Sequence, residues 1–299
     1  MQYGKPPLSF EQQADLLIGR GLIADKAFLV KRLQQVNYYR LSGYLYPYRQ
    51  PDNTFQADTA FEKIWRHYTF DRRLRLRLIV MDAIERVEVS IKTQLVYALS
   101  MQTGAFGYTA AQTFPNLKVE DYTNWLNKVV TKEVNRSKET FVSHFRAKYG
   151  DTHKFLPLWM LSEIMSFGCV LTMYRGVTTE IKKEISASYG VPDLVLTSWL
   201  HTISVIRNTC AHHCRLWNRE LGVKPLLPNK HKYPQWHVPV AIPQNRIFGV
   251  LTILRYWLSI IAPQSKWTER LLDLLDEYPE ISRGHMGFPD NWTDSPLWQ

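Results

Sequence analysis

The chain of 299 residues has few cysteines, no apolar run long enough to cross a membrane and a minority of acidic side chains. The cysteines are Cys169, Cys210 and Cys214, an odd and sparse set that argues against a disulfide framework and for a reducing compartment. The most apolar run, Ile247–Ala262, is shorter than the roughly 20 residues that span a bilayer, and Arg255 interrupts it. No apolar signal segment opens the sequence. We therefore expect a cytoplasmic protein without a membrane partner.

The shortage of acid leaves the chain strongly basic. Its 27 Asp and Glu against 37 Lys and Arg give a formal net charge of +10 and a pI of about 9.4. Basic residues dominate the centre of the sequence, and acidic ones gather after Pro263: Glu269, Asp273, Asp276, Glu277 and Glu280. This uneven charge indicates a polyanionic partner, nucleic acid first and a membrane surface second.

Glycine and proline are both absent from Phe61–Ser100, where apolar residues recur at helical spacing. This pattern predicts one long amphipathic helix or two helices end to end. A brief strand is expected at Phe55–Asp58, and strand patterns are otherwise scarce. The chain therefore reads as all-α. Further helices are expected over Phe10–Ile18, Asp25–Gln35, Leu158–Tyr174, Thr179–Tyr189, Asp193 into residue 210, Gln244–Ile261 and Trp267–Tyr278.

The element pattern divides the chain into three expected parts. These are an N-terminal helical segment (1–60), a helical bundle (61–262) and an acidic C-terminal helix and tail (263–299). Residues 220–243 contain five prolines, so no helix can continue through them. This loop carries Lys224, Lys230 and Lys232, and it is either a nucleic-acid contact or a mobile surface excursion.

The most informative short segment is Arg207–His212, in which an arginine precedes a histidine by five positions and Asn208 follows the arginine. Metal-free cleavage of RNA needs a base for the 2′-OH proton and an acid for the leaving oxygen, and histidine suits both near neutral pH. A guanidinium can hold the negative oxygens of the transition state. Asn208 could orient His212. The alternative is a basic helix end that favours the helix dipole.

Helix geometry limits what this pair can do alone. Positions five apart on an ideal helix point roughly 140° away from each other. Either the helix ends or distorts near His212, or a second copy of the chain completes the site.

Two nearby residues are candidates for supporting roles. His213 is expected near the apolar stripe Val195–Cys210, in core packing more than in catalysis. Glu88 falls on the apolar face of the long predicted helix and needs a partner. That partner is Arg207 or His213, or a group on another helix. Cys210, His213 and Cys214 lack a second ligand pair, so we expect no metal and no cofactor.

Candidate RNA-binding residues lie in two further stretches. Tyr39 and Arg40 belong to an aromatic and basic cluster over residues 38–49, which either stacks RNA bases or covers a small core. Arg72 and Arg73 either follow phosphates or lie on a solvated helix face.

Several blocks of the sequence occur in an order that resembles the Abi-like family of bacterial abortive-infection proteins (the AbiD/AbiF group). The blocks are Asn37–Tyr44, Tyr68–Asp71 with Leu74–Arg75, Ile84–Glu88, Leu156–Trp159 continuing to Gly168, and Arg207–Asn218. The family is assigned to the HEPN superfamily of metal-independent ribonucleases. The resemblance implies a HEPN-like helical bundle with an N-terminal helical extension, and a site built by a homodimer. Arg207 and His212 would be its catalytic pair, with Asn208 as the polar residue between them.

The resemblance further implies a toxin-like endoribonuclease of phage defence, restrained by a cognate non-coding RNA. Attack by the 2′-OH would leave 2′,3′-cyclic phosphate and 5′-OH ends. We expect the dimer interface to include Val195–Trp217, with Leu216 and Trp217 as apolar anchors. The alternative function is a non-catalytic RNA-binding module of the same fold. Membrane-surface binding would explain the charge but not the motif.

Overall fold

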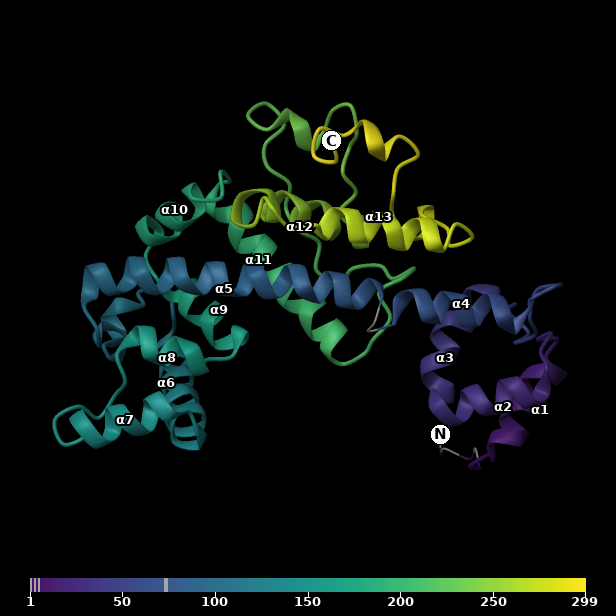
Figure 1. The fold of residues 1–299 in the computed structure, drawn as a ribbon, viewed down its shortest axis with the longest axis horizontal. Coiled ribbons are helices and arrows are strands. Elements are labelled where there is room, and N and C mark those ends of the chain that lie inside the picture. Colours follow the sequence, from purple (N-terminus) through teal and green to yellow (C-terminus); the bar gives the residue numbers. More distant parts are fainter. Residues whose placement is uncertain (1, 3, 5, 73–74) are drawn as a thin grey trace.

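The structure is a computed structural model that describes residues 2, 4, 6–72 and 75–299, with the backbone alone at residue 131. The described chain is all-α, as expected (Figure 1). Its extended pairings are two isolated bridges, Ile23 with Ala60 and Arg49 with Phe55. The strand expected at Phe55–Asp58 is therefore wrong. The left-handed backbone of Asp58, with φ at 59°, ends the extended run after one bridging residue.

The fold is built around α5, which runs from Leu76 to Thr103 through the middle of the molecule (Figure 1). Ile84, Ile91 and Leu95 are fully buried on it, as their helical spacing predicts. The helices that pack most extensively against α5 are α8 (Leu158–Ile164), α10 (Thr179–Ala187), α11 (Asp193–Ala211), α12 (Ile247–Ile261) and α13 (Trp267–Glu277).

The stretch expected to form one long helix or two is two helices end to end. Helix α4 (Phe61–Asp71) ends where Arg72 takes an extended backbone, with ψ at 171°, and α5 begins at Leu76. The break lies next to Asp71, which is fully buried.

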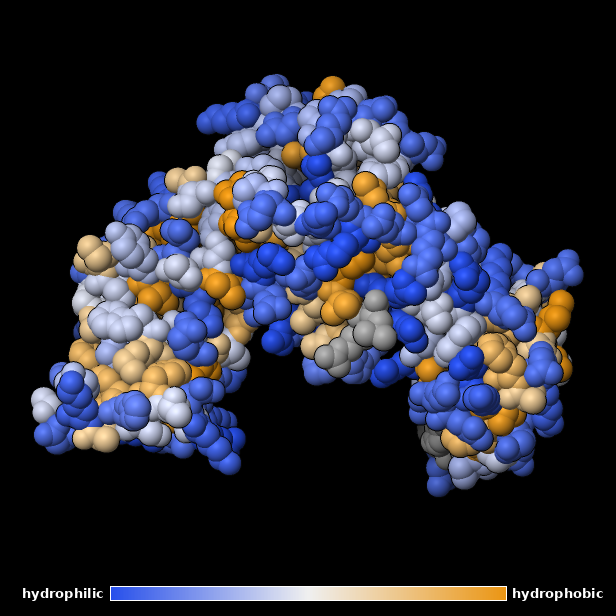
Figure 2. Space-filling view, viewed as in Figure 1, coloured by the Kyte–Doolittle hydropathy of each residue, from blue (hydrophilic) through white to orange (hydrophobic). Residues whose placement is uncertain are grey.

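Two arms extend from the central layer and give the molecule the form of an arch (Figures 1 and 2). One arm holds α1 (Phe10–Gly19), α2 (Lys26–Gln35) and α3 (Tyr38–Leu45). The other holds α6 (Val119–Asn127), a π-helical turn (Lys128–Val134) and α7 (Thr140–Tyr149). Side-chain caps begin the first three helices, from Ser9, Asp25 and Asn37 respectively.

The helix expected over Leu158–Tyr174 is divided in two. Helix α8 ends at Ile164, and α9 runs from Phe167 to Gly176. In a continuous helix Met165 and Phe167 would point about 200° apart. The extended backbone of Met165 and Ser166 allows both apolar side chains to be buried.

The proline-rich loop 220–243 contains no α-helix, as expected, and its middle packs against the core. Trp236 is fully buried, with its ring 5.0 Å from that of Trp199 on α11. Indole Nε1 of Trp199 donates in turn to the Leu226 carbonyl at 2.7 Å. The loop forms one short 3-10 turn, Pro234–Trp236, and through Trp236 it contributes an aromatic side chain to the core.

The acidic C-terminal part packs on the same centre. Trp267, at the start of α13, donates from Nε1 to the Ile79 carbonyl of α5 at 2.7 Å. Trp298 stacks on Phe248 of α12, with ring centroids 5.6 Å apart. In the described part of the chain, no helix is long and apolar enough to cross a membrane.

Candidate active site

The Arg207–His212 segment lies in the last turn of α11. Figure 1 shows this end of the helix passing α5 toward the hollow between the two arms. His212 is the residue at which the helix ends, and its N–H donates to the Asn208 carbonyl at 2.9 Å. Asn208 and His212 are exposed, and the Arg207 side chain is 38% exposed. The motif is therefore open to a large ligand.

A Schellman turn ends α11 directly after His212. The N–H of His213 donates to the Cys210 carbonyl at 3.0 Å, and the N–H of Cys214 donates to the Thr209 carbonyl at 2.9 Å. His213 occupies the left-handed position of this turn, with φ at 58°, where glycine is usual. Helix geometry left two alternatives, a helix that ends or distorts near His212 or a site completed by a second copy of the chain. The helix does end at His212.

The chain after the turn is held by one buried carboxylate, that of Asp71. It accepts hydrogen bonds from the backbone N–H of Leu216 at 3.0 Å, the N–H of Trp217 at 2.9 Å and the hydroxyl of Tyr44 at 2.5 Å. Three blocks that carry the family resemblance, Asn37–Tyr44, Tyr68–Asp71 and Arg207–Asn218, therefore meet at this carboxylate.

Two arginines complete this anchor. Buried Arg77 donates to the Cys214 carbonyl at 3.2 Å, and Arg215 donates to the Gly43 carbonyl of α3. Burial raises the pKa of Asp71, while the Tyr44 hydrogen bond and the charge of Arg77 act in the opposite direction. The anchor fixes the backbone on the C-terminal side of His212, so the imidazole projects from a rigid turn.

Arg207 is paired with Glu88 on the neighbouring helix α5. Its Nε lies 3.3 Å from carboxylate Oε1 of Glu88, whose side chain is 22% exposed. Burial raises the pKa of Glu88, and the Arg207 charge partly offsets that rise. Of the partners considered for Glu88, the structure thus selects Arg207. In the described chain, no hydrogen bond or ion pair joins Arg207 to His212, although both lie at the same helix end.

His213 lies just beyond the helix end, in the left-handed turn, and is partly buried, so its role in core packing stays a prediction. One expectation about this segment is wrong. Leu216 and Trp217 are buried in their own protomer and are not available as dimer anchors. Trp217 packs against His67 with ring centroids 4.3 Å apart and stacks on Tyr44.

The expected RNA-binding residues are not gathered in one place. Tyr39 and Arg40 are exposed on α3, with Tyr39 75% exposed. Arg72 is half-buried at the end of α4, and Arg73 lies outside the described residues. Lys224, Lys230 and Lys232 are exposed on the loop, where Lys224 pairs with Glu220 at 3.6 Å.

The acidic C-terminal part neutralises some of the central arginines. Arg66 pairs with Glu280, and Arg75 pairs with Glu277. Arg77 is buried. Arg66, Arg75 and Arg77 are therefore engaged within the chain, and a role of Arg72 or Arg73 in binding phosphate stays a prediction.

Sequence reasoning missed Asp71, Tyr44 and Arg77 as the supports of the site. The available signal was an aspartate at the end of an aromatic block, but its partners lie 145 residues further along the chain.

The cysteines near the motif are also placed by the structure. Cys214 is exposed, and burial raises the pKa of the Cys210 thiol to about 12. Among the described residues, no group of three or more His, Cys, Asp and Glu side chains is placed to hold a metal ion.

Fold and site together define an all-α protein that presents an arginine and a histidine at an anchored helix end. Residues 31–218 match the family described as Abi-like protein, and the chain belongs to that family. The match ends at Asn218, the residue that follows the Asp71 anchor. Searches among curated proteins and among solved structures find no match to this chain.

Proposed function

We propose that this protein is a metal-independent endoribonuclease of the HEPN type, acting as a toxin-like effector in abortive phage defence. The observation that carries the proposal is the exposed His212 on a rigid turn, with the Arg207–Glu88 pair beside it. The basic surface of the chain suits an RNA substrate. Membership of the Abi-like family supports the role in abortive infection.

The chemistry requires two histidines at one phosphate. One His212 takes the proton of the 2′-OH, O2′ bonds to phosphorus, and the bond from phosphorus to O5′ breaks. The second His212 donates a proton to the departing O5′, which leaves 2′,3′-cyclic phosphate and 5′-OH ends. One protomer supplies a single His212, so acid and base come from two copies of the chain around a two-fold axis.

Arg207 holds the phosphate oxygens as negative charge develops on them. Glu88 sets the direction of this guanidinium, since the two lie 3.3 Å apart on helices packed against each other. The Glu88 carboxylate also keeps the half-buried arginine neutralised until a phosphate replaces it as the partner. Asn208 is exposed one turn before His212 and lies on the side open to substrate.

An enzyme of this kind damages its own cell and therefore needs restraint. A cognate non-coding RNA is the restraining partner that we propose, because the same basic surface that binds substrate can bind a decoy RNA.

Growth inhibition on expression in a bacterial host tests the proposal. The wild-type chain should inhibit growth, and His212→Ala or Arg207→Ala should relieve inhibition at equal protein level. Loss of an acid–base or oxyanion-stabilising group costs roughly 100-fold or more in rate. His201→Ala is the matched control, because His201 is also an exposed histidine of α11. Toxicity that survives in both variants would contradict the proposed function.

A further inference from the structure

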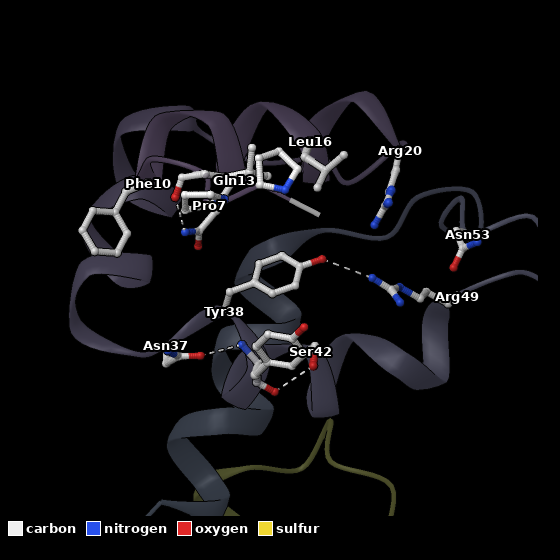
Figure 3. A pocket seen from close by; sticks show the side chains of 13 residues that line it. Pro7, Phe10, Gln13, Leu16, Arg20, Asn37, Tyr38, Ser42, Arg49 and Asn53 are labelled. Carbon is white, nitrogen blue, oxygen red and sulfur yellow. Dashed lines mark hydrogen bonds between the residues drawn. The ribbon is translucent and has the colours of Figure 1, made fainter. Parts of the chain in front are cut away.

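A mixed aromatic and basic cleft of about 570 Å³ lies in the N-terminal arm, away from the Arg207–His212 turn (Figure 3). It is lined by the approach to α1 and by α1 itself, by the start of α3 and by the loop after α3. Its volume falls in the usual range for small-ligand sites, roughly 300–1,000 Å³. The side chains that matter most are Arg20, Tyr38, Tyr39 and Arg49.

One end of this N-terminal cleft concentrates positive charge. Figure 3 shows the guanidinium groups of Arg20 and Arg49 at the same end of the cleft, with that of Arg49 directed at the Tyr38 hydroxyl. Arg49 donates to that hydroxyl at 3.3 Å. The described residues that line the cleft include no carboxylate. Two arginines at one end of a cleft whose described lining holds no acid are suited to an anion such as a phosphate.

The rest of the cleft offers aromatic faces. Tyr38 and Tyr39 stand edge to face, with ring centroids 5.9 Å apart, and Tyr39 is 75% exposed. Phe10 is also exposed at the rim. A phosphate site beside exposed aromatic rings fits a nucleotide, whose base stacks while its phosphate pairs with arginine. A proline-rich peptide would use the rings but would leave both guanidinium groups without an anionic partner.

The N-terminal cleft is joined mechanically to the proposed catalytic turn through α3. The start of this helix lines the cleft, and its end supplies the Gly43 carbonyl to Arg215 and the Tyr44 hydroxyl to Asp71. Eight residues of helix are about 12 Å long. A ligand bound in the cleft is therefore held at a fixed distance from the segment that anchors His212.

We propose that the N-terminal cleft binds a nucleotide of a single-stranded RNA at a position outside the scissile phosphate. This inference rests on the proposed function and adds a strand-binding subsite to it. Arg20 and Arg49 hold a backbone phosphate, and Tyr39 stacks on the adjoining base.

The experiment measures binding in the full-length His212→Ala protein, so cleavage cannot affect the readout. The probe is a fluorescein-labelled oligouridylate of about 12 nucleotides, followed by anisotropy across a range of salt concentrations. Tyr39→Ala should weaken binding about tenfold, and Tyr39→Trp should retain it because the stacking face is kept. Arg20→Gln should weaken binding and reduce the salt slope by about 0.7, the contribution of one phosphate contact on a single strand.

Lys183→Gln is the charge-matched control, because Lys183 is exposed on α10 outside the cleft and should leave both quantities near the parent values. Unchanged affinity in both Tyr39→Ala and Arg20→Gln would overturn the inference. Competition by uridine monophosphate that equals competition by the strand would assign the cleft to a free nucleotide and overturn its role as a strand subsite. If the wild-type protein cleaves no RNA, the proposed function fails, whereas the binding result in the His212→Ala protein is still obtained.

Discussion

At the residue scale, one carboxylate holds together parts of the chain that lie far apart in the sequence. Asp71 accepts from two backbone N–H groups and the Tyr44 hydroxyl in a fully buried position. A buried donor that loses its acceptor costs about 1–3 kcal/mol. The position of His212 therefore depends on a residue of a different helix that has no catalytic chemistry of its own.

Asp71→Ala should lower the free energy of unfolding by roughly 3 kcal/mol or more, because three buried donors lose their acceptor at once. Asp71→Asn keeps an acceptor oxygen and should cost clearly less. Urea denaturation followed by circular dichroism measures both values. Equal losses in the two variants would show that the carboxylate oxygens are not the acceptors that hold this segment.

His67 gives stability a defined pH dependence. Its Nδ1 donates to the Lys63 carbonyl at 2.6 Å, so Nε2 is free to accept from the Tyr48 hydroxyl at 3.3 Å. Burial lowers the pKa of His67. As pH falls below about 6.5, the unfolded chain binds a proton that the folded chain resists, so the free energy of unfolding falls.

His67→Gln should remove part of the loss of stability between about pH 6.5 and pH 5. Urea unfolding of the wild type and of His67→Gln across this pH range measures the two free energies of unfolding. A steeper loss in the variant than in the wild type would contradict a depressed pKa at His67.

At the element scale, the end of α11 determines where His212 points. The Schellman turn places His213 at a φ of 58°, where a Cβ atom is unfavourable. His213→Ala and His213→Gly both remove the imidazole and its interactions. The difference between their free energies of unfolding therefore reports the cost of the left-handed backbone conformation alone.

His213→Gly should be more stable than His213→Ala by about 1 kcal/mol. Thermal unfolding of the two variants under one set of conditions measures the difference. Equal stability, or greater stability for alanine, would mean that residue 213 does not hold the left-handed conformation.

Local sequence signals predicted much of the helical framework. Ile84, Ile91 and Leu95 mark α5 by their spacing, and Asp193 after Pro192 marks the start of α11. Helix α3 was missed because its tyrosines, divided between a buried face and the cleft, read equally well as an aromatic surface cluster. Helices α6 and α7 were not predicted.

The support of the candidate site could not be predicted in the same way. The pairing of Asp71 with Leu216 joins residues 145 positions apart, and no local pattern encodes it. The pair Glu88–Arg207 was predicted only as one of several alternatives. The residue spacing places Glu88 on one face of its helix, but it does not show which other helix packs against that face. Long-range packing decides both contacts.

At the scale of the whole molecule, the two arms enclose a hollow (Figure 2), toward which the end of α11 points (Figure 1). The proposed mechanism needs two His212 side chains at each phosphate. Activity should therefore depend on dimers in which both copies are intact.

Co-expression of wild type with His212→Ala in equal amounts tests this dependence. Random pairing leaves about one quarter of the dimers with both histidines, so cleavage should fall to about one quarter of the wild-type rate per total protein. Co-expression with His201→Ala in place of His212→Ala should cause no loss. A fall to only one half would mean that each protomer acts alone.

The central claim is that Arg207 and His212 cleave RNA without a metal ion. Its most direct measurement is the chemical nature of the RNA ends produced by the purified protein in EDTA, with His212→Ala and His201→Ala assayed in parallel. The wild type and His201→Ala should produce 2′,3′-cyclic phosphate and 5′-OH ends, and His212→Ala should lose roughly 100-fold or more in rate. Cleavage that stops in EDTA and returns with a divalent ion, or equal rates in all three proteins, would contradict the central claim.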